Sequence, residues 1–143
     1  MENTNIDEPV ILKIHKNHIE DVEFQTRLAG STFYDNAQEL LKALKNSSVT
    51  QAIRLNFVCE PDNPEDKYAV QIYLSLLNYS QTYLIGHVPK DCSHLIFYVL
   101  KHPNLYDLSV YNIRILGCTP DKENAGLFFN FKITPIPQYT NRG

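Results

Sequence analysis

The segment Glu60-Pro-Asp-Asn-Pro-Glu-Asp-Lys-Tyr-Ala-Val70 decides the fold of this 143-residue chain, because it places a stiff turn between two stretches that favour strands. Its two prolines fix φ and remove backbone donors, so a sheet ladder cannot continue through them. The side chains of Asp62, Asn63 and Asp66 can accept hydrogen bonds from nearby backbone N–H groups, as turn residues commonly do. We therefore expect a rigid loop that follows one strand and leads into the next.

The residues around this loop alternate between apolar and polar side chains or are rich in residues that favour strands. Ala52–Cys59 precedes the loop and alternates with a period of two. Tyr68–Leu74 and Thr82–Val88 follow it and are separated by the polar residues Asn78–Gln81. The pattern predicts one strand before the loop and a hairpin after it.

The N-terminal part predicts two strands and a helix. Val10–His15 has the apolar, β-branched content of a strand, and Asp21–Ala29 alternates with a period of two. Within residues 35–45, three leucines follow at helical spacing, and Asp35 or Asn36 could cap the start of the helix. We expect both strands to join the sheet.

The C-terminal half predicts a second helix and a second hairpin. Lys90–Leu100 has apolar residues at helical spacing, although its aromatic and β-branched content leaves a strand possible. Leu108–Leu116 and Leu127–Ile133 resemble the two arms of a hairpin, with the turn-rich residues 117–126 as a long loop between them. The residues from 135 to 143 are expected to form a flexible tail.

Together these elements predict a mainly β fold with two helices. Six or seven strands linked mostly by short turns favour a small antiparallel β-barrel, of the OB-like or SH3-like kind, with helices covering its openings. We expect a polar lead over residues 1–9, a single domain over residues 10–134 and the tail after it. The sequence shows no internal repeat or second domain.

The composition is that of a folded, soluble protein. Hydrophobic residues make up 43% and charged residues 20% of the chain, and no apolar stretch is long enough to cross a bilayer. The formal net charge of −3 excludes a protein that coats nucleic acid by charge alone, because such proteins present a basic surface. Any binding of nucleic acid must therefore be local.

The N-terminus and the cysteines favour a cytoplasmic protein. The first residues are acidic and polar, whereas a secretory signal begins with basic residues and continues into an apolar stretch. The three cysteines, Cys59, Cys92 and Cys118, lie far apart without a Cys-x-x-Cys pair, which argues against a disulfide framework and against a zinc site.

The chain has no pattern typical of an enzyme. It lacks a glycine-rich phosphate loop, a His-Glu-x-x-His motif and a Gly-x-Ser-x-Gly motif, and its histidines have no metal spacing beyond His15-x-x-His18. The acidic residues of the 60–66 loop lack the glycine and the spacing of a calcium loop. We expect a non-enzymatic protein without a cofactor or a metal.

Three segments, taken together, resemble the HIRAN domain. They are Arg27-Leu-Ala-Gly-Ser-Thr-Phe-Tyr34, the stretch from Leu55 to Val70 that contains the loop, and Leu84-Ile-Gly-His-Val-Pro-Lys-Asp91. They occur in the family's order, and the middle motif is the most specific of the three. The resemblance covers roughly residues 25–100, and the C-terminal hairpin would complete the same barrel.

The resemblance implies recognition of the 3′ end of single-stranded DNA. In the family, aromatic side chains stack on the terminal bases while an acidic side chain of the loop accepts a hydrogen bond from the free 3′-hydroxyl. Carried over by position, Asp66 is the hydroxyl acceptor and Phe33 is the leading stacking residue, with Tyr34 as the adjacent candidate. Strand alternation would turn one of these two aromatic residues inward. The full set of candidate binding residues is Thr32, Phe33, Tyr34, Asn63, Glu65, Asp66, Lys67, His87 and Lys90.

Two residues depart from the DNA-end-binding members of the family. Glu65 stands where they carry an aromatic residue, and Thr32 stands where they carry an arginine. A stacking surface and a cation are therefore missing, which leaves weaker binding, a different ligand or no DNA binding as the open outcomes.

The alternative function is a protein-interaction adaptor that uses the same groove. The family's module usually serves a helicase or a nuclease, which this chain lacks, so we expect such a protein as a partner. The predicted context is DNA repair, DNA processing or a mobile element.

Overall fold

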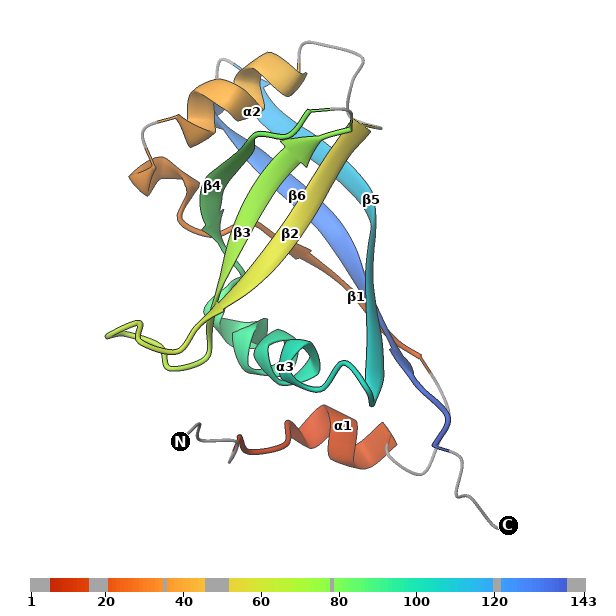
Figure 1. Ribbon diagram of the computed structural model, residues 1–143. Helices are drawn as coiled ribbons and strands as arrows, with labels where there is room; N and C mark the ends of the chain where they lie inside the picture. Colours follow the sequence, from red (N-terminus) through yellow and green to blue (C-terminus); the bar gives the residue numbers. More distant parts are fainter. Residues whose placement is uncertain are drawn as a thin grey trace.

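Six strands form two antiparallel sheets in the computed structural model, which describes residues 6–15, 21–34, 36–45, 52–77, 79–119 and 122–138 (Figure 1). The first sheet has the order β1-β6-β5, and the second has the order β2-β3-β4. The strands are β1 (Val22–Arg27), β2 (Ile53–Glu60), β3 (Ala69–Leu76), β4 (Thr82–His87), β5 (Tyr106–Thr119) and β6 (Lys122–Pro135). The predicted mainly β, antiparallel fold is confirmed.

Apolar side chains from both sheets meet in one core. In β6, every second residue from Leu127 to Ile133 is fully buried, as expected for a strand with one face toward the core. The ring of Phe57 in β2 lies 6.2 Å from that of Phe129 and 5.2 Å from that of Phe131, measured between centroids. These aromatic contacts hold the two sheets face to face.

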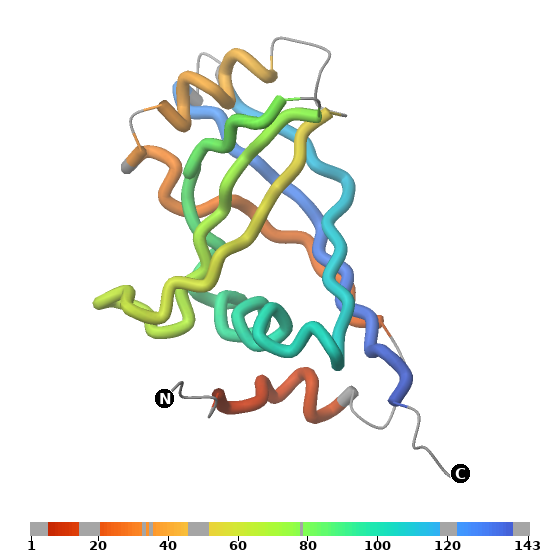
Figure 2. The backbone as a smooth tube through the Cα atoms, viewed as in Figure 1, coloured from red at the N-terminus to blue at the C-terminus, as the bar shows by residue number. Residues whose placement is uncertain are grey.

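On one side, the two sheets are connected beyond the end of β1. Figure 2 shows the chain running on past Arg27 toward β4. There the N–H of Ala29 donates to the carbonyl of His87 at 2.8 Å, and the N–H of His87 donates back at 2.9 Å. This single bridge brings the end of β4 against the residues that follow β1.

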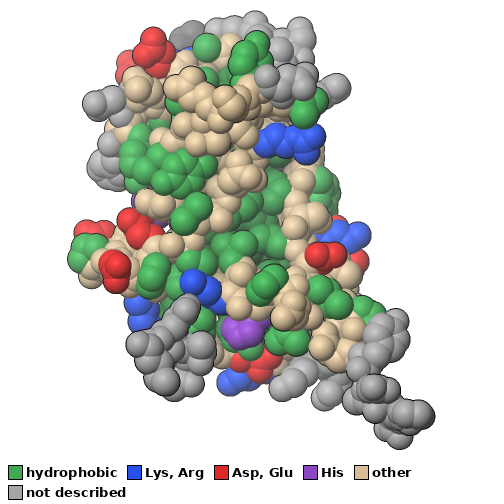
Figure 3. All heavy atoms as spheres, in the orientation of Figure 1, with side chains coloured by type: hydrophobic (Ala, Val, Ile, Leu, Met, Phe, Trp, Pro, Cys, Tyr) green, Lys and Arg blue, Asp and Glu red, His purple; other side chains and the backbone are tan. Residues whose placement is uncertain are grey.

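On the other side, β2 and β5 are the outer strands of their sheets. A groove of about 340 Å³ lies between them and is lined by residues 53–57 of β2, by Leu100, and by Leu108, Val110 and Ile113 of β5. Figure 3 shows hydrophobic side chains in this opening. Within the described residues β2 and β5 are not hydrogen-bonded neighbours, so a closed barrel is not confirmed.

Helices cover both ends of the two sheets. The helix α2 (Ala37–Lys45) lies across one end, and α3 (Lys90–Lys101) lies across the other, with α1 (Val10–His15) beside it (Figure 1). Their apolar faces are buried, with Leu41 of α2 and Ile96 of α3 fully enclosed. A short 3-10 turn, η1 (Ser31–Phe33), precedes α2. The two predicted helices are thus confirmed, and the strand alternative for residues 90–100 is wrong.

The prediction of a strand over Val10–His15 is wrong, because this segment is the helix α1. The carbonyl of Pro9 accepts hydrogen bonds from the N–H groups of Leu12 and Lys13, which starts a helical turn. Among the side chains of α1 that the structure describes, only Leu12 is buried, whereas Val10 and Ile14 are 69% and 64% exposed. A strand would place alternate side chains on the core, but here a single apolar side chain reaches it.

The C-terminal hairpin is longer than predicted. Residues 117–126 were expected to form a loop, but β5 continues to Thr119 and β6 begins at Lys122. Gly117 has a φ of 104° and lies at a shift in register, which lets pairing continue through this glycine-containing stretch. The long loop is therefore wrong, and residues 120 and 121 lie outside the described residues.

Two further predictions concern the start of α2 and the residues that follow β6. Asp35, one of the two candidate caps of α2, lies outside the described residues, and the carbonyl of Asn36 accepts the N–H of Leu40 at 2.9 Å. Past β6, the N–H of Ile136 donates to the carbonyl of Leu105 at 2.8 Å.

None of the described helices combines the length and the apolar character that crossing a membrane requires.

Candidate functional site

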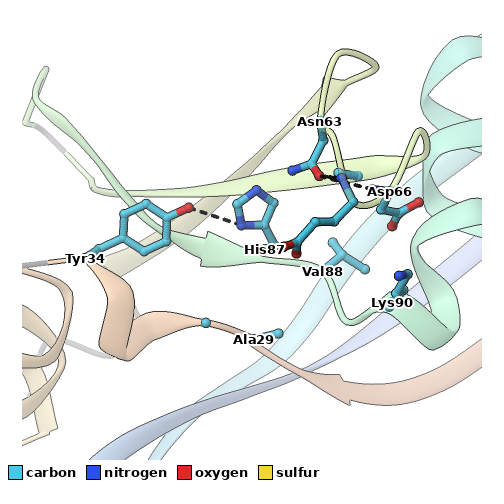
Figure 4. A pocket seen from close by; sticks show the side chains of 10 residues that line it. Ala29, Tyr34, Asn63, Asp66, His87, Val88 and Lys90 are labelled. Carbon is cyan, nitrogen blue, oxygen red and sulfur yellow. Dashed lines mark hydrogen bonds between the residues drawn. The ribbon is translucent and has the colours of Figure 1, made fainter.

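A pocket of about 360 Å³ lies where the 60–66 loop, the end of β4 and the start of α3 converge (Figure 4). Ala29 and His87, which are joined by the bridge between the two sheets, both line it. Its lining residues are Ala29, Gly30, Tyr34, Asn63, Glu65, Asp66, Ala69, His87, Val88 and Lys90.

Asn63 builds the loop that forms one wall of the pocket. Its side-chain oxygen accepts the N–H of Glu65 at 2.8 Å and the N–H of Asp66 at 3.1 Å. Its amide nitrogen donates to Oε1 of Glu60 at 3.0 Å, which attaches the loop to the end of β2. The turn that the prolines and Asn63 predict is therefore confirmed, and it presents Glu65 and Asp66 at the pocket.

The carboxylate of Asp66 is held from two directions. Its Oδ1 accepts the N–H of Tyr68 at 2.9 Å, and its Oδ2 accepts the hydroxyl of Ser93 at 2.8 Å. Ser93 belongs to the first turns of α3 and is 2% exposed. Each carboxylate oxygen can accept a second hydrogen bond, so Asp66 is positioned in advance and retains capacity for a ligand.

His87 faces the pocket from the end of β4. Gly86 allows the close approach that puts it there, since a Cβ at this position would lie 2.4 Å from the carbonyl oxygen of Ala29. The ring Nε2 of His87 lies 2.8 Å from Oε1 of Glu60, and its Nδ1 lies 3.2 Å from the hydroxyl of Tyr34. Three residues from separate segments are thereby connected along one side of the pocket.

The electrostatics of this side follow from the same contacts. Hydrogen bonds from Asn63, and then from His87, hold the pKa of Glu60 below its ordinary value, so Glu60 is a carboxylate. Burial, followed by the nearby charge of Glu60, raises the pKa of Tyr34, so its hydroxyl keeps its proton. The lining itself carries the carboxylates of Glu65 and Asp66 against the single ammonium of Lys90.

The structure brings six of the nine candidate residues to the pocket. Of the other three, Thr32 is exposed and does not line it, and the ammonium of Lys67 lies 5.0 Å from the centre of the Tyr68 ring. Phe33 belongs to η1, but its side chain lies outside what the structure describes. The six that line the pocket are Tyr34, Asn63, Glu65, Asp66, His87 and Lys90.

Sequence reasoning missed Glu60 and Ser93 as parts of this site. Neither lines the pocket itself, but each is hydrogen-bonded to a residue that does: Glu60 to His87, and Ser93 to Asp66. A glutamate at the end of a strand and a serine near the start of a helix are ordinary local features. Their contacts depend on residues 27 positions away in the chain, and no short-range pattern signals them.

Two further expectations concern metals and disulfides. Cys59 and Cys92 are free thiols, and the side chain of Cys118 lies outside what the structure describes. Across the described parts of the chain, no group of three or more His, Cys, Asp or Glu side chains is placed to hold a metal ion.

The family model of the HIRAN domain matches residues 21–127, a span that contains every residue lining the pocket. The chain belongs to the HIRAN family. HIRAN domains are nucleic-acid-binding modules, and this membership is consistent with DNA binding. Comparison with curated proteins gives no match, and comparison with solved structures gives none either.

Proposed function

We propose that the pocket of this HIRAN protein binds the 3′ end of single-stranded DNA, with Asp66 accepting a hydrogen bond from the free 3′-hydroxyl. The observation that carries this proposal is the fixed carboxylate of Asp66, held by the Tyr68 amide and the Ser93 hydroxyl at the pocket wall. A carboxylate attracts a terminal hydroxyl but repels the phosphate that follows an internal nucleotide. The carboxylate of Asp66 can thereby distinguish the 3′ end of a strand from an internal nucleotide.

The start of α3, next to Asp66, supports contact with the last phosphate of the strand. Lys90 is the first residue of α3, whose initial N–H groups carry no side-chain cap, and it lines the pocket beside Val88. An ammonium and the start of a helix both attract anions. The pocket volume of about 360 Å³ falls within the range of sites for small ligands, which suits one terminal nucleotide.

The acidic residues predict modest affinity, because they repel the phosphates of the strand. The carboxylate of Glu65 lines the pocket where an aromatic ring would stack on a base, and the whole chain carries a net charge of −3. We propose a recognition role without catalysis, in which a helicase or nuclease partner acts on the strand in DNA repair, DNA processing or a mobile element.

The same carboxylates favour one alternative. Glu65 and Asp66 outnumber Lys90 in the lining, so a basic side chain of a partner protein could occupy the pocket instead of a nucleotide. In that case the chain would serve as an adaptor between proteins.

The test compares single-stranded oligonucleotides with a free or a phosphorylated 3′ end, by fluorescence anisotropy at low salt. We expect roughly tenfold tighter binding of the free hydroxyl, since a hydrogen bond to a charged group contributes about 1.5–3 kcal/mol. Asp66→Asn should remove this preference, and the matched loop variant Asp62→Asn should retain it. Equal binding of both oligonucleotides, or binding of neither, contradicts end recognition, and the second result favours the adaptor.

A further inference from the structure

Tyr34 and His87 of the pocket lining are hydrogen-bonded in a row with Glu60, which does not line the pocket. The hydroxyl of Tyr34 lies 3.2 Å from Nδ1 of His87, and Nε2 of His87 lies 2.8 Å from Oε1 of Glu60. Tyr34 and His87 line the pocket, as Figure 4 shows, while Glu60 lies behind the imidazole at the end of β2. The hydrogen bonds between these three side chains therefore connect the pocket to the carboxylate of Glu60, which lies outside the lining.

The positions of the protons follow from the acceptor at one end. Glu60 is a carboxylate because hydrogen bonds from Asn63 and His87 lower its pKa, and a carboxylate can only accept hydrogen bonds. Nε2 of His87 must then carry a hydrogen. In the neutral ring Nδ1 is left as an acceptor, so the hydroxyl of Tyr34 points its hydrogen at the ring.

Protonation of His87 reverses the second hydrogen bond. Nδ1 gains a hydrogen and becomes a donor, so Tyr34 must accept from it and turn its own hydrogen away. When His87 is neutral, the hydrogens of its ring and of the Tyr34 hydroxyl are therefore both engaged, and neither can be donated to a ligand. Protonated His87 adds a positive charge and releases the hydroxyl of Tyr34 to donate to an anion.

Charged and polar groups surround His87 at the pocket. They come from β2, the segment after η1, the 60–66 loop and α3, while β3 contributes two polar side chains. In the described residues, the carboxylates among them outnumber the single ammonium, so a phosphate entering the pocket meets net repulsion unless positive charge is added. These groups are Glu60, Tyr34, Asn63, Glu65, Asp66, Lys90, Gln71 and Tyr73.

We propose that Tyr34, His87 and Glu60 form a proton-linked phosphate subsite, in which binding of a strand phosphate is coupled to uptake of one proton by His87. Glu60 is the positioning residue that holds the imidazolium, and Tyr34 donates its released hydroxyl hydrogen to the phosphate. The inference rests on the proposed binding of a strand end in this pocket and adds how its affinity is regulated.

The test measures affinity for a single-stranded oligonucleotide with a free 3′ end across the range of about pH 5 to 8, in which imidazole changes its charge. Coupling to one proton should weaken binding by up to about tenfold per pH unit as the pH rises. Calorimetry of the unsubstituted protein in buffers of different ionisation enthalpy should show net uptake of a proton on binding. This second measurement does not depend on any variant folding.

Variants separate the three roles. His87→Gln should make affinity independent of pH at the weak level that the native protein has near pH 8. Glu60→Gln should move the rise in affinity to lower pH, because the amide no longer stabilises the imidazolium. Tyr34→Phe should weaken binding several-fold at acidic pH and leave it unchanged at alkaline pH. His94→Gln is the matched control, since His94 stacks on Tyr68 outside the pocket, and it should keep the native pH profile.

The outcomes distinguish this inference from the proposal on which it rests. Binding that does not change with pH overturns the proton-linked subsite but leaves recognition of the strand end standing. Proton uptake that persists in His87→Gln likewise overturns the proton-linked subsite and leaves recognition of the strand end standing. Failure of the oligonucleotide to bind at every pH overturns both.

Discussion

The hydroxyl of Ser93 donates a 2.8 Å hydrogen bond to Oδ2 of Asp66, and this bond fastens the 60–66 loop to α3. Ser93 is the only polar residue among the described ones that is buried in the core, at 2% exposed. The same hydroxyl lies 3.3 Å from the carbonyl oxygen of Lys90, within its own helix. The acceptor proposed for a strand end is thus oriented by a side chain that does not line the pocket.

Ser93→Ala should destabilise the protein by about 1–2 kcal/mol, because it removes a hydrogen bond to a charged group while water still reaches Asp66. Urea unfolding measures this loss. Ser109→Ala, at an exposed position of β5, should change stability by less than about 0.5 kcal/mol. Equal effects of the two substitutions would show that the Ser93 hydroxyl does not fasten the loop.

Gly86→Ala should destabilise the protein by roughly 2–3 kcal/mol, because the new methyl group has no room. Its Cβ would lie 2.4 Å from the carbonyl oxygen of Ala29 and 2.5 Å from a methyl carbon of Leu28. Relief of this clash requires the bridge between Ala29 and His87 to open, so binding at the pocket should weaken as well.

The matched control for this position is Gly126→Ala. Its Cβ would lie 3.1 Å from the ring of Phe128, which can move, and at an ordinary contact distance of 3.9 Å from the carbonyl oxygen of Leu116. We expect a clearly smaller loss in a denaturant titration. A Gly86→Ala protein as stable as the native one would contradict the close packing of the bridge.

The fold was largely predictable because its strands and two longer helices carry clear periodicity. Residues 60–66 were the most predictable part, since the prolines and Asn63 determine the turn through contacts within a few positions. The segment Val10–His15 failed because a short apolar stretch favours a strand and a helix about equally. In the structure it is a helix, and among its described side chains Leu12 is the one buried in the core.

The candidate site was less predictable because its contacts depend on strand register. The pairing of β3 with β4 shifts between Ile72 and Tyr73, so that Gln71, and not Val70, lies opposite His87. Without this bulge, the side chain of His87 would point to the other face of the sheet, away from Glu60. No pattern in the sequence marks such a shift, and the pair of Glu60 and His87 therefore escaped sequence analysis.

Glu60 should contribute stability at neutral pH that is lost in acid. Hydrogen bonds from Asn63, and then from His87, lower its pKa in the folded protein, whereas in the unfolded chain it titrates near 4.5. A lowered folded pKa means that the contribution is complete above the unfolded value and disappears as the pH falls through the folded value. Acid should therefore weaken the fold partly through this group.

Urea unfolding of native protein and Glu60→Gln over a series of pH values checks this expectation. The native protein should be more stable at neutral pH, and the difference should shrink as the pH falls below the unfolded value. Glu39→Gln, on the exposed side of α2, removes the same charge elsewhere and should have little effect at neutral pH. A difference between native protein and Glu60→Gln that is constant with pH would contradict the role assigned to the carboxylate.

Glu65→Tyr should strengthen binding of single-stranded DNA by tenfold or more. Glu65 is exposed at the pocket, beside Asp66, so a tyrosine there would add a ring for base stacking and remove a negative charge. Stacking of a base on an aromatic side chain contributes about 1–3 kcal/mol, and each 1.4 kcal/mol corresponds to about a tenfold change in affinity. Anisotropy titrations at fixed salt measure the gain.

Two further variants separate stacking from charge. Glu65→Gln removes the charge alone and should give a smaller gain that vanishes at high salt, because screening removes the same repulsion. Asp62→Asn removes one negative charge from the same loop at an exposed position outside the lining, and it should change affinity least. Equal affinities of Glu65→Tyr and Glu65→Gln would mean that no base stacks on the side chain at position 65.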